Sequence, residues 1–359
     1  MNEIKVAIAG LGNCASSLIQ GIEYYKNIDD NSGFIPGIMH NYFGNYRIKD
    51  IKIVAAFDVN KNKVGKDLSE AIFTEPNCTL KFCEVPKTGI KVQKGHLLDG
   101  LGENLKKIVP VDPHQREENV ANILRERNVD ILINYLPTGS MKASEFYAEQ
   151  ALIAGCGFIN AIPELIASNP EWGLKFKNQG LPLAGDDIKS QIGATIVNRV
   201  LIDMCHKRGV KVEESYQLNL AGNTDFLNFL EPEREKSKLR CKNEALQSQI
   251  PYKSSIGVAL NYIESQKDNK ICYISLKGIN FGGAPVTIDL KMSVEDSPNS
   301  AGIMVDAIRA MKIALDNGIS GSLNDICAYY FKNPPEQHTD DEAYSMVEKF
   351  LSSYKILNS

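Results

Sequence analysis

The sequence lacks the features that mark several large classes of protein. It contains no run of about 18 apolar residues, which argues against a membrane-spanning helix. The opening segment MNEIKVAIAGLG carries an acid early, and its short apolar stretch ends in glycines, unlike a signal peptide. Internal repeats and low-complexity segments are also missing. We therefore expect a folded cytoplasmic protein without a membrane partner.

Strong charge and paired cysteines are lacking as well. The formal net charge is -4, so the sequence does not favour nucleic acid as a partner. The eight cysteines are scattered and none forms a CxxC pair, which argues against a zinc ribbon or a thiol redox motif. A bridge between Cys78 and Cys83 stays open, but scattered cysteines in a cytosolic enzyme are usually reduced and buried.

What is present is an alternation of apolar strands and amphipathic helices in the first half of a 359-residue chain. A chain of this length favours two domains. Strands are predicted at 5–10, 51–58, 129–136, 157–162 and 181–185, with helices at 14–25, 116–128, 142–154 and 171–178. This order is typical of a parallel sheet with helices on both faces.

The pattern changes after residue 190. We predict a helix at 190–208, strands at 211–220 and 271–281, and helices at 300–317 and 340–353. Residues 286–295 alternate strictly between apolar and polar, as in a sheet with one wet or partner-covered face. The predicted fold class is α/β: a Rossmann-type doubly wound parallel sheet with an inserted α+β domain that carries a mainly antiparallel sheet. The predicted domains are 1–189 with 300–359, and 190–299.

The segment KVAIAGLGNCASSL at 5–18 fits a dinucleotide-binding fingerprint. Gly10 allows the tight turn, Gly12 lets the backbone approach a pyrophosphate, and Ala15 keeps helix and strand close. Asp58 ends the second strand, where an acid binds the adenine ribose and favours NAD. It follows Gly10 by 48 residues rather than about 20, and we expect the excess at 26–49 to cover part of the cofactor. A glycine turn without a ligand and a turn-capping Asp58 are the simpler alternatives.

Three other stretches are polar where a core would be apolar. GDDIKSQ at 185–191 follows the fifth strand, where ligands bind in such sheets, although its aspartates fit a helix cap equally well. Lys238 and Lys242 are four residues apart on a predicted helix and suit an anion between them, but a solvated helix fits their spacing better, as neighbouring Arg234, Lys236 and Arg240 illustrate. VEDSPNSAG at 294–302 leads into a helix whose amides suit a phosphate, or it is a plain capped turn.

Together these motifs resemble one family. GxGNxASS near the start, INYLPTGS at 133–140, FINAIPELIAS at 158–168, GDDIKSQIGAT at 185–195, NTDF…EPEREKSK and EDSPNSAG occur in the order found in myo-inositol-1-phosphate synthases of the shorter archaeal and bacterial type. GDDIKSQIGAT and EDSPNSAG are far more specific than a glycine fingerprint. The resemblance implies conversion of D-glucose 6-phosphate to 1D-myo-inositol 3-phosphate by NAD-dependent internal oxidation, enolisation, aldol cyclisation and reduction. A conventional NAD-dependent dehydrogenase and a non-catalytic NAD-binding regulator are the alternatives.

The resemblance also implies roles for particular residues. It implies a homotetramer built through the sheet of the second domain, and it leaves open a divalent or monovalent cation for which no motif fixes a site. The catalytic residues it implies are Lys238, Lys242, Lys270, Lys332 and Asp296. Those around NAD are Gly10, Gly12, Asn13, Cys14, Ala15, Asp58, Tyr135, Leu136, Pro137, Asp187, Ser190 and Asp225. Those around the substrate are Ser297, Asn299, Ser300, Lys238 and Lys242.

Overall fold

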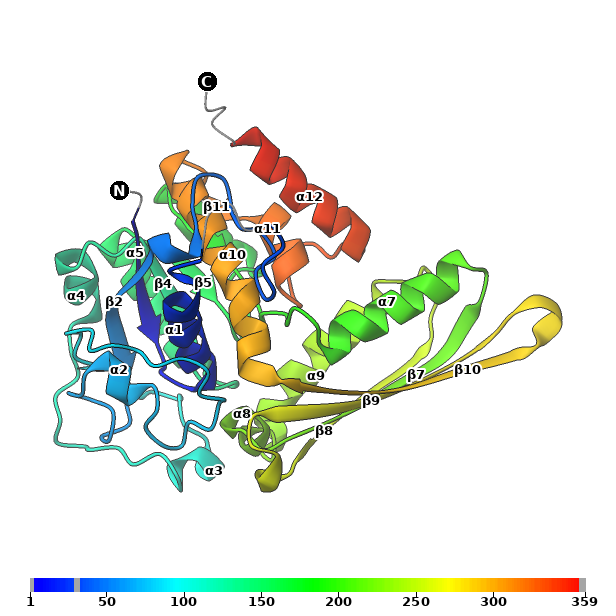
Figure 1. Cartoon of the computed structure of the whole chain (residues 1–359), viewed down its shortest axis with the longest axis horizontal. Helices are drawn as coiled ribbons and strands as arrows, with labels where there is room; N and C mark the ends of the chain where they lie inside the picture. Colours follow the sequence, from blue (N-terminus) through cyan, green and yellow to red (C-terminus); the bar gives the residue numbers. More distant parts are fainter. Residues whose placement is uncertain (1–2, 29–32, 355–359) are drawn as a thin grey trace.

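A parallel sheet of seven strands forms the larger part of the molecule (Figure 1). The structure, a computed structural model, describes residues 3–28 and 33–354, without the side chains at 237, 238 and 240–242. The strand order β11-β6-β5-β4-β1-β2-β3 contains the Rossmann order and adds β11 beside β6. The strands are β1 (Ile4–Ala9), β2 (Ile51–Asp58), β3 (Gln93–Lys94), β4 (Ile131–Asn134), β5 (Gly157–Asn160), β6 (Pro182–Ala184) and β11 (Gly321–Ser322).

Helices cover both faces of this sheet because its strands alternate apolar side chains between two cores. On β1, Val6 and Ile8 pack against one layer, and Ala7 and Ala9 pack against the other. The first layer holds α1 (Asn13–Tyr25), α10 (Asp296–Asp316), α11 (Asn324–Tyr330) and α12 (Asp340–Ser353). The second holds α4 (Val120–Glu126), α5 (Met141–Ala154) and α6 (Pro170–Asn178). The short helices are α2 (Leu68–Ala71), α3 (Glu103–Lys106) and η1 (Ile48–Asp50).

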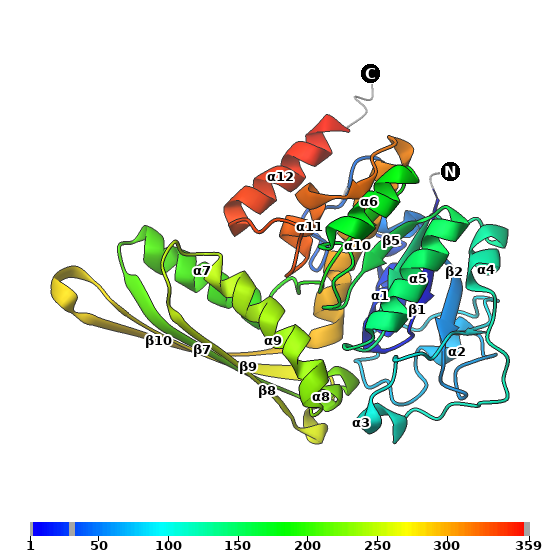
Figure 2. The same cartoon turned by 180° about the vertical axis from the view of Figure 1, so that it is seen from behind.

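A second sheet of four strands projects from the first part as an arm (Figures 1 and 2). Its order is β10-β9-β7-β8; β9 pairs antiparallel with both β10 and β7, whereas β7 and β8 run parallel. The prediction of a mainly antiparallel sheet is therefore confirmed, with a parallel pair at one edge. The elements are β7 (Lys211–Ala221), β8 (Ser255–Tyr262), β9 (Asn269–Ile279), β10 (Pro285–Glu295), α7 (Ala194–Lys207), α8 (Thr224–Asn228), α9 (Pro232–Gln247), η2 (Glu264–Gln266) and η3 (Phe281–Gly283).

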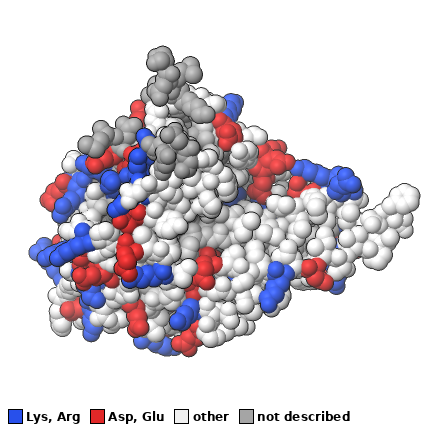
Figure 3. All heavy atoms as spheres, in the orientation of Figure 1, with Lys and Arg blue, Asp and Glu red and all other residues white. Residues whose placement is uncertain are grey.

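The two faces of this arm differ. Cores formed with α7 and the end of α9 bury Cys272, Ile274 and Leu276 of β9 on one face. The other face leaves Tyr216, Leu218 and Tyr273 exposed. Figure 3 shows charges of both signs scattered over the parallel-sheet part, whereas the tip of the arm is uncharged on the face in view.

Three helices begin four residues from the predicted start, and one of them is α4, which begins at Val120 rather than at 116. Helix α7 begins at Ala194 rather than at 190, because Gly193 is extended and the chain before it is hydrogen-bonded to Asn299. Helix α10 begins at Asp296 rather than at 300. Pro298 does not prevent this start, because the first turn of a helix needs no amide donor there. Among the described helices, none combines the length and apolar character that a membrane span needs.

The segment at 26–49, expected to cover the cofactor, packs elsewhere, so that prediction is wrong for its described residues. Phe43 is fully buried in the core beside α10, and Arg309 of α10 donates to the carbonyl oxygen of His40 at 2.8 Å. His40 also pairs with Asp306 of α10 and Glu348 of α12. Apolar burial against the first helix layer determines its place. Residues 29–32 of the segment lie outside the described part.

Candidate active site

A large cleft lies at the carboxyl ends of the parallel strands, where loops of the first part meet residues of the arm. Open space in it, including the part that joins solvent, amounts to about 1750 Å³. The residues that line it run from the glycine loop after β1 to Lys270 of β9, so the cleft extends across both parts of the molecule.

The loop after β1 forms a cradle for a pyrophosphate. Gly10 has a φ of +91°, and a Cβ there would lie 2.6 Å from the carbonyl oxygen of Tyr135, so no larger residue fits. A Cβ at Gly12 would meet nothing within 4 Å and would project into open space. The N-terminus of α1 has no side-chain cap and no acid in its first turn. Its amides suit an anion at this point.

Asp58 fixes the neighbouring turn while it lines the cleft. Its carboxylate accepts hydrogen bonds from the amide of Leu11 at 2.9 Å and from the amide of Asn60 at 2.8 Å. Asp58 therefore caps the turn, as the simpler alternative proposed, and it also lines the cleft.

Lys63 is a cleft residue that the sequence motifs do not include. It is buried, and its ammonium donates to the carbonyl oxygen of Leu11 at 2.7 Å and to the amide oxygen of Asn77 at 2.8 Å. Burial lowers the pKa of Lys63, and Asp58 partly opposes this shift. The ammonium of Lys63 thus lies against the glycine loop. Lys63 and Leu11 are far apart in the sequence, so no local motif reveals this contact.

At the other end of the cleft, the segment after β6 is paired with a segment after α11. Ile188 forms an antiparallel bridge with Phe331, and backbone hydrogen bonds join 186–189 to 330–333. This pairing places the ammonium of Lys332 2.9 Å from a carboxylate oxygen of Asp187 and 2.6 Å from the carbonyl oxygen of Ile188. Next to it, burial lowers the pKa of Lys189 to about 7, with Arg199 as the second cause.

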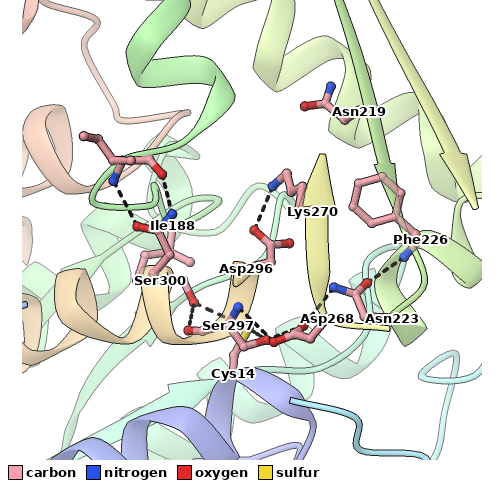
Figure 4. A network of polar contacts seen from close by, with 12 residues as sticks. Cys14, Ile188, Asn219, Asn223, Phe226, Asp268, Lys270, Asp296, Ser297 and Ser300 are labelled. Carbon is pink, nitrogen blue, oxygen red and sulfur yellow. Dashed lines mark hydrogen bonds and ion pairs between the residues drawn. The ribbon is translucent and has the colours of Figure 1, made fainter. Parts of the chain in front are cut away.

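A second lysine–aspartate pair comes from the arm. Lys270 of β9 lies 2.8 Å from Asp296, the first residue of α10, and the two side chains point toward each other (Figure 4). Asp268 is only 1% exposed and accepts hydrogen bonds from Asn223 at 3.1 Å and from the hydroxyl of Ser297 at 2.9 Å. Burial, followed by the charge of Asp296, raises the pKa of Asp268 to about 6. Asp296 thus contacts the ammonium of Lys270, and its charge also acts on the buried carboxyl of Asp268.

Neutral donors complete the wall between these pairs. Burial raises the pKa of the Tyr135 hydroxyl well above its ordinary value, and among the described residues this buried hydroxyl has no hydrogen-bond partner. Burial also raises the pKa of Cys14 to about 11, so its thiol stays neutral beside Ser300, whose hydroxyl lies 3.6 Å from the sulfur. The hydroxyl of Thr138 donates to Asp225 at 3.0 Å. A bound ligand would satisfy the tyrosine donor.

Most of the residues proposed from the sequence gather in this cleft. Asn299 is not among its lining residues; it holds the backbone at 191–192 through hydrogen bonds instead. The side chains of Lys238 and Lys242 lie outside the described residues. The residues that were proposed from the sequence and that line the cleft are Gly10, Gly12, Asn13, Cys14, Ala15, Asp58, Tyr135, Leu136, Pro137, Asp187, Ser190, Asp225, Lys270, Asp296, Ser297, Ser300 and Lys332.

Comparison with known proteins identifies the family. Residues 193–297 match the family model of myo-inositol-1-phosphate synthase. The chain is 48% identical to the inositol-3-phosphate synthase of Corynebacterium glutamicum, over 97% of this chain and 98% of that protein. It is 47% identical to the inositol-3-phosphate synthase of Mycobacterium tuberculosis strain H37Rv, over 97% of this chain and 96% of that protein. The chain belongs to the myo-inositol-1-phosphate synthase family.

A solved structure shares the fold. The crystal structure of Ari2 superposes with a TM-score of 0.80 at 32% identity, covering 98% of this chain and 99% of the other. The predicted family and fold class are therefore confirmed. A cation site is a different matter. Within the described residues no group of three or more His, Cys, Asp or Glu side chains is placed to hold a metal ion.

Proposed function

We propose that this member of the myo-inositol-1-phosphate synthase family is an NAD-dependent isomerase that converts D-glucose 6-phosphate to 1D-myo-inositol 3-phosphate. The observation that carries the proposal is the pair of lysine–aspartate contacts in one cleft, Lys332 with Asp187 and Lys270 with Asp296. One comes from the parallel-sheet part and the other from the arm, and both share the cleft with the glycine cradle.

The residues of the cleft fit NAD. The space above Gly12 and the uncapped N-terminus of α1 suit its pyrophosphate, and Asp58 suits the adenine ribose hydroxyls. When bound, NAD supplies a reversible hydride acceptor to the site. We assign Asn13, Cys14, Ala15, Leu136 and Pro137 to the same binding surface because they line this part of the cleft. Tyr135, Asp187, Ser190 and Asp225 are assigned to its nicotinamide end.

The lysines supply positive charge where the proposed reaction develops negative charge. Each step, from enolisation to ring closure, places charge on a sugar oxygen, and fixed ammonium groups shielded from water stabilise such charge strongly. Asp296 orients Lys270 through the 2.8 Å contact, and Asp187 orients Lys332 at 2.9 Å. Asp296 is also suited to take up and return a proton. Lys238 and Lys242 are assigned to the same task by the family resemblance.

The substrate is proposed to bind beside the start of α10. Ser297 and Ser300 line the cleft there, and Asn299 holds the adjacent backbone at 191–192. This assignment rests on the family resemblance, because Ser297 donates through both its amide and its hydroxyl to Asp268 in the structure. The cation, divalent or monovalent, stays a prediction.

The proposed reaction is redox-neutral, and this property tests it. With NAD far below the concentration of glucose 6-phosphate and no external oxidant, we expect many turnovers per NAD and no lasting rise in NADH absorbance. Steady accumulation of NADH would instead support a conventional dehydrogenase. NAD binding without consumption of any sugar phosphate would support a regulator. Either result would overturn the proposal.

A matched pair of variants on β9 sharpens this experiment. Lys270→Met removes an oxyanion-stabilising charge and is expected to lower kcat by ~100- to 1,000-fold. Lys277→Met removes the same charge from an exposed position on the same strand. There the ammonium of Lys277 forms a surface ion pair with Glu214 at 3.3 Å. The turnover of Lys277→Met should stay near that of the unmodified enzyme. Equal activity in both variants would remove Lys270 from the catalytic set.

Assembly, location and domain division are further parts of the proposal. The exposed sheet face of the arm, which carries Tyr216, Leu218 and Tyr273 beside Asp289 and Lys291, supports a homotetramer formed through the second sheet. We propose a cytoplasmic location. We also propose that residues 1–189 with 300–359 serve the cofactor and that 190–299 serve catalysis and assembly.

A further inference from the structure

Helix α9 carries the positions of Lys238 and Lys242, and its N-terminal end is held by the parallel-sheet part. The guanidinium of Arg234 donates to the carbonyl oxygen of Thr138 at 2.9 Å and to that of Asp99 at 2.7 Å. Glu231, the N-cap residue, accepts a hydrogen bond from the amide of Asn104 at 2.7 Å. Arg234 thus has a structural position that its sequence context, typical of a solvated helix, does not reveal. Its side chain is only 11% exposed.

The surroundings of Arg234 are shaped to admit its side chain. Two glycines face it across the contact. A Cβ on Gly139 would lie 2.6 Å from Cγ of Arg234, and a Cβ on Gly102 would lie 2.6 Å from Nε of Arg234 and even closer to the carboxylate of Glu231. Because a guanidinium is a planar fork of donors, it reaches two carbonyl groups at once, which a lysine ammonium on a flexible stem does not reproduce.

Both acceptor loops belong to the proposed cofactor site. Thr138 lines the cleft directly after Tyr135–Pro137, and its hydroxyl donates to Asp225. Gly100 and Leu101, next to Asp99, also line the cleft, while the carboxylate of Asp99 caps the start of α5 at 2.8 and 2.9 Å. Arg234 therefore bonds the backbone of two cleft loops from the helix that carries the lysine positions.

We propose that Arg234 is a positioning residue that sets α9, and with it Lys238 and Lys242, relative to the cofactor loops at 97–102 and 137–139. The proposal rests on the proposed function, because it assigns the α9 lysines to that reaction. Position 234 lies four residues before 238 and eight before 242, so the three positions share one side of the helix. A shift at the Arg234 contact therefore moves the lysine positions relative to the cofactor loops.

The first test compares two cations on the same helix. Arg234→Met is expected to lower kcat by about 100-fold, the loss that a displacement of about 1 Å can cause. The dissociation constant of NAD, measured by fluorescence titration, should change by less than about threefold. The control Lys236→Met removes an exposed lysine that pairs with Glu233 at 2.9 Å. This variant should keep its activity. The kcat of Arg234→Lys should lie between those of Arg234→Met and the unmodified chain, because an ammonium can make one of the two carbonyl contacts but not both.

The second test disturbs the same contact from the opposite loop. Gly102 has a φ of -77°, which alanine adopts freely, so Gly102→Ala should fold while its Cβ displaces the side chains of both Glu231 and Arg234. We expect kcat to fall with Arg234 still present. In the double variant Gly102→Ala/Arg234→Met, the loss should be smaller than the two single losses combined, because both changes disturb the Arg234 contact. Additive losses would overturn the proposal, as would near-normal kcat in Arg234→Met.

Hydrogen exchange separates this proposal from the proposed function. In the unmodified chain, NAD alone should slow amide exchange in α9, and Arg234→Met should remove that effect while NAD still binds. Lys236→Met should retain it. If the unmodified chain does not convert glucose 6-phosphate, the proposed function fails. The NAD-dependent change in amide exchange would still report on the Arg234 contact. NAD-dependent slowing in Arg234→Met equal to that in the unmodified chain would refute the positioning role.

Discussion

Asp268 holds a carboxyl group in an environment that disfavours its charge. It is buried beside Asp296, and the hydrogen bonds from Asn223 and Ser297 only partly offset the loss of water. Since burial and a neighbouring acid both favour the protonated form, the folded chain keeps a proton that an unfolded chain releases at lower pH. The free energy of unfolding must therefore depend on this proton.

The direction of that dependence is a testable prediction. The pKa of Asp268 rises from 3.8 to about 6 in the folded chain. The group thus favours folding at low pH, and its contribution is lost as pH rises from about 4 to 6, by about 3 kcal/mol at 1.36 kcal/mol per pKa unit. Asp268→Asn should lack this loss, so its stability relative to the unmodified chain should rise over that range. Urea unfolding at a series of pH values measures it.

The control for this prediction is Asp289→Asn, which neutralises an exposed acid on β10. Asp186, whose pKa burial also raises to about 6, is present in both variants and cancels in the comparison. Stability curves of Asp268→Asn and the unmodified chain that run parallel from pH 4 to 7 would contradict the argument.

The glycine cradle was predictable at the residue scale, but its supporting charges were not. Gly10, Gly12 and Asp58 form a local motif whose geometry follows from a strand, a turn and a helix in sequence. Lys63 and Asp268 acquire their positions from contacts with Leu11 and Asn223, which are distant in sequence. No spacing rule encodes such contacts, and the only local signal for Asp268 is its nearness to Lys270.

At the scale of elements, α7 joins two distant parts of the chain through one arginine. Arg199 is fully buried, and its guanidinium donates to Asp340 at 2.9 Å, to the carbonyl oxygen of Ala245 at 2.6 Å and to that of His338 at 2.9 Å. These acceptors belong to α12, to the end of α9 and to the segment before α12. The far end of α9 is thereby tied to the C-terminal helix.

We predict that Arg199→Met destabilises the chain by about 3 kcal/mol. Removing one partner of a buried pair leaves a carboxylate and two carbonyl groups without their donor, and such changes typically cost about 3–5 kcal/mol. The lower end applies because Asp340 retains some contact with water. Arg208→Met, at the exposed C-cap of the same helix, is the control and should change stability by less than about 0.5 kcal/mol. Chemical unfolding measures both, and similar midpoints would refute the prediction.

Periodicity predicted some elements better than others. Strand β10 alternates Val286, Ile288, Leu290 and Met292 with polar residues, and the structure packs Ile288, Leu290 and Met292 against the helix side of the arm. Strand β8 was not predicted, although Ile256 and Val258 alternate inward in the same way. Its parallel pairing with β7 requires the intervening α8 and α9, so a search for hairpins does not find it.

At the scale of the whole molecule, the arm leaves the sheet face with Tyr216, Leu218 and Tyr273 uncovered in a single chain. If this face forms the proposed tetramer, Tyr273→Asp should place a charge in the interface and yield smaller assemblies. Light scattering of the unmodified chain should give the mass of four copies. Leu174→Asp, on an equally exposed apolar residue of α6, should remain a tetramer. A single-chain mass for the unmodified protein would rule out the assembly.

The path of the chain through its two sheets also affects synthesis on the ribosome. Strand β6 ends at Ala184, but α10, which buries Met304 and Ile308 on the same sheet, begins only at Asp296. The intervening 111 residues take about 6–22 s to translate at about 5–20 residues per second. Throughout that interval the nascent parallel sheet has α1 on this face but lacks the cover that α10 later supplies. This enzyme therefore offers chaperones a binding surface during translation that the finished chain conceals.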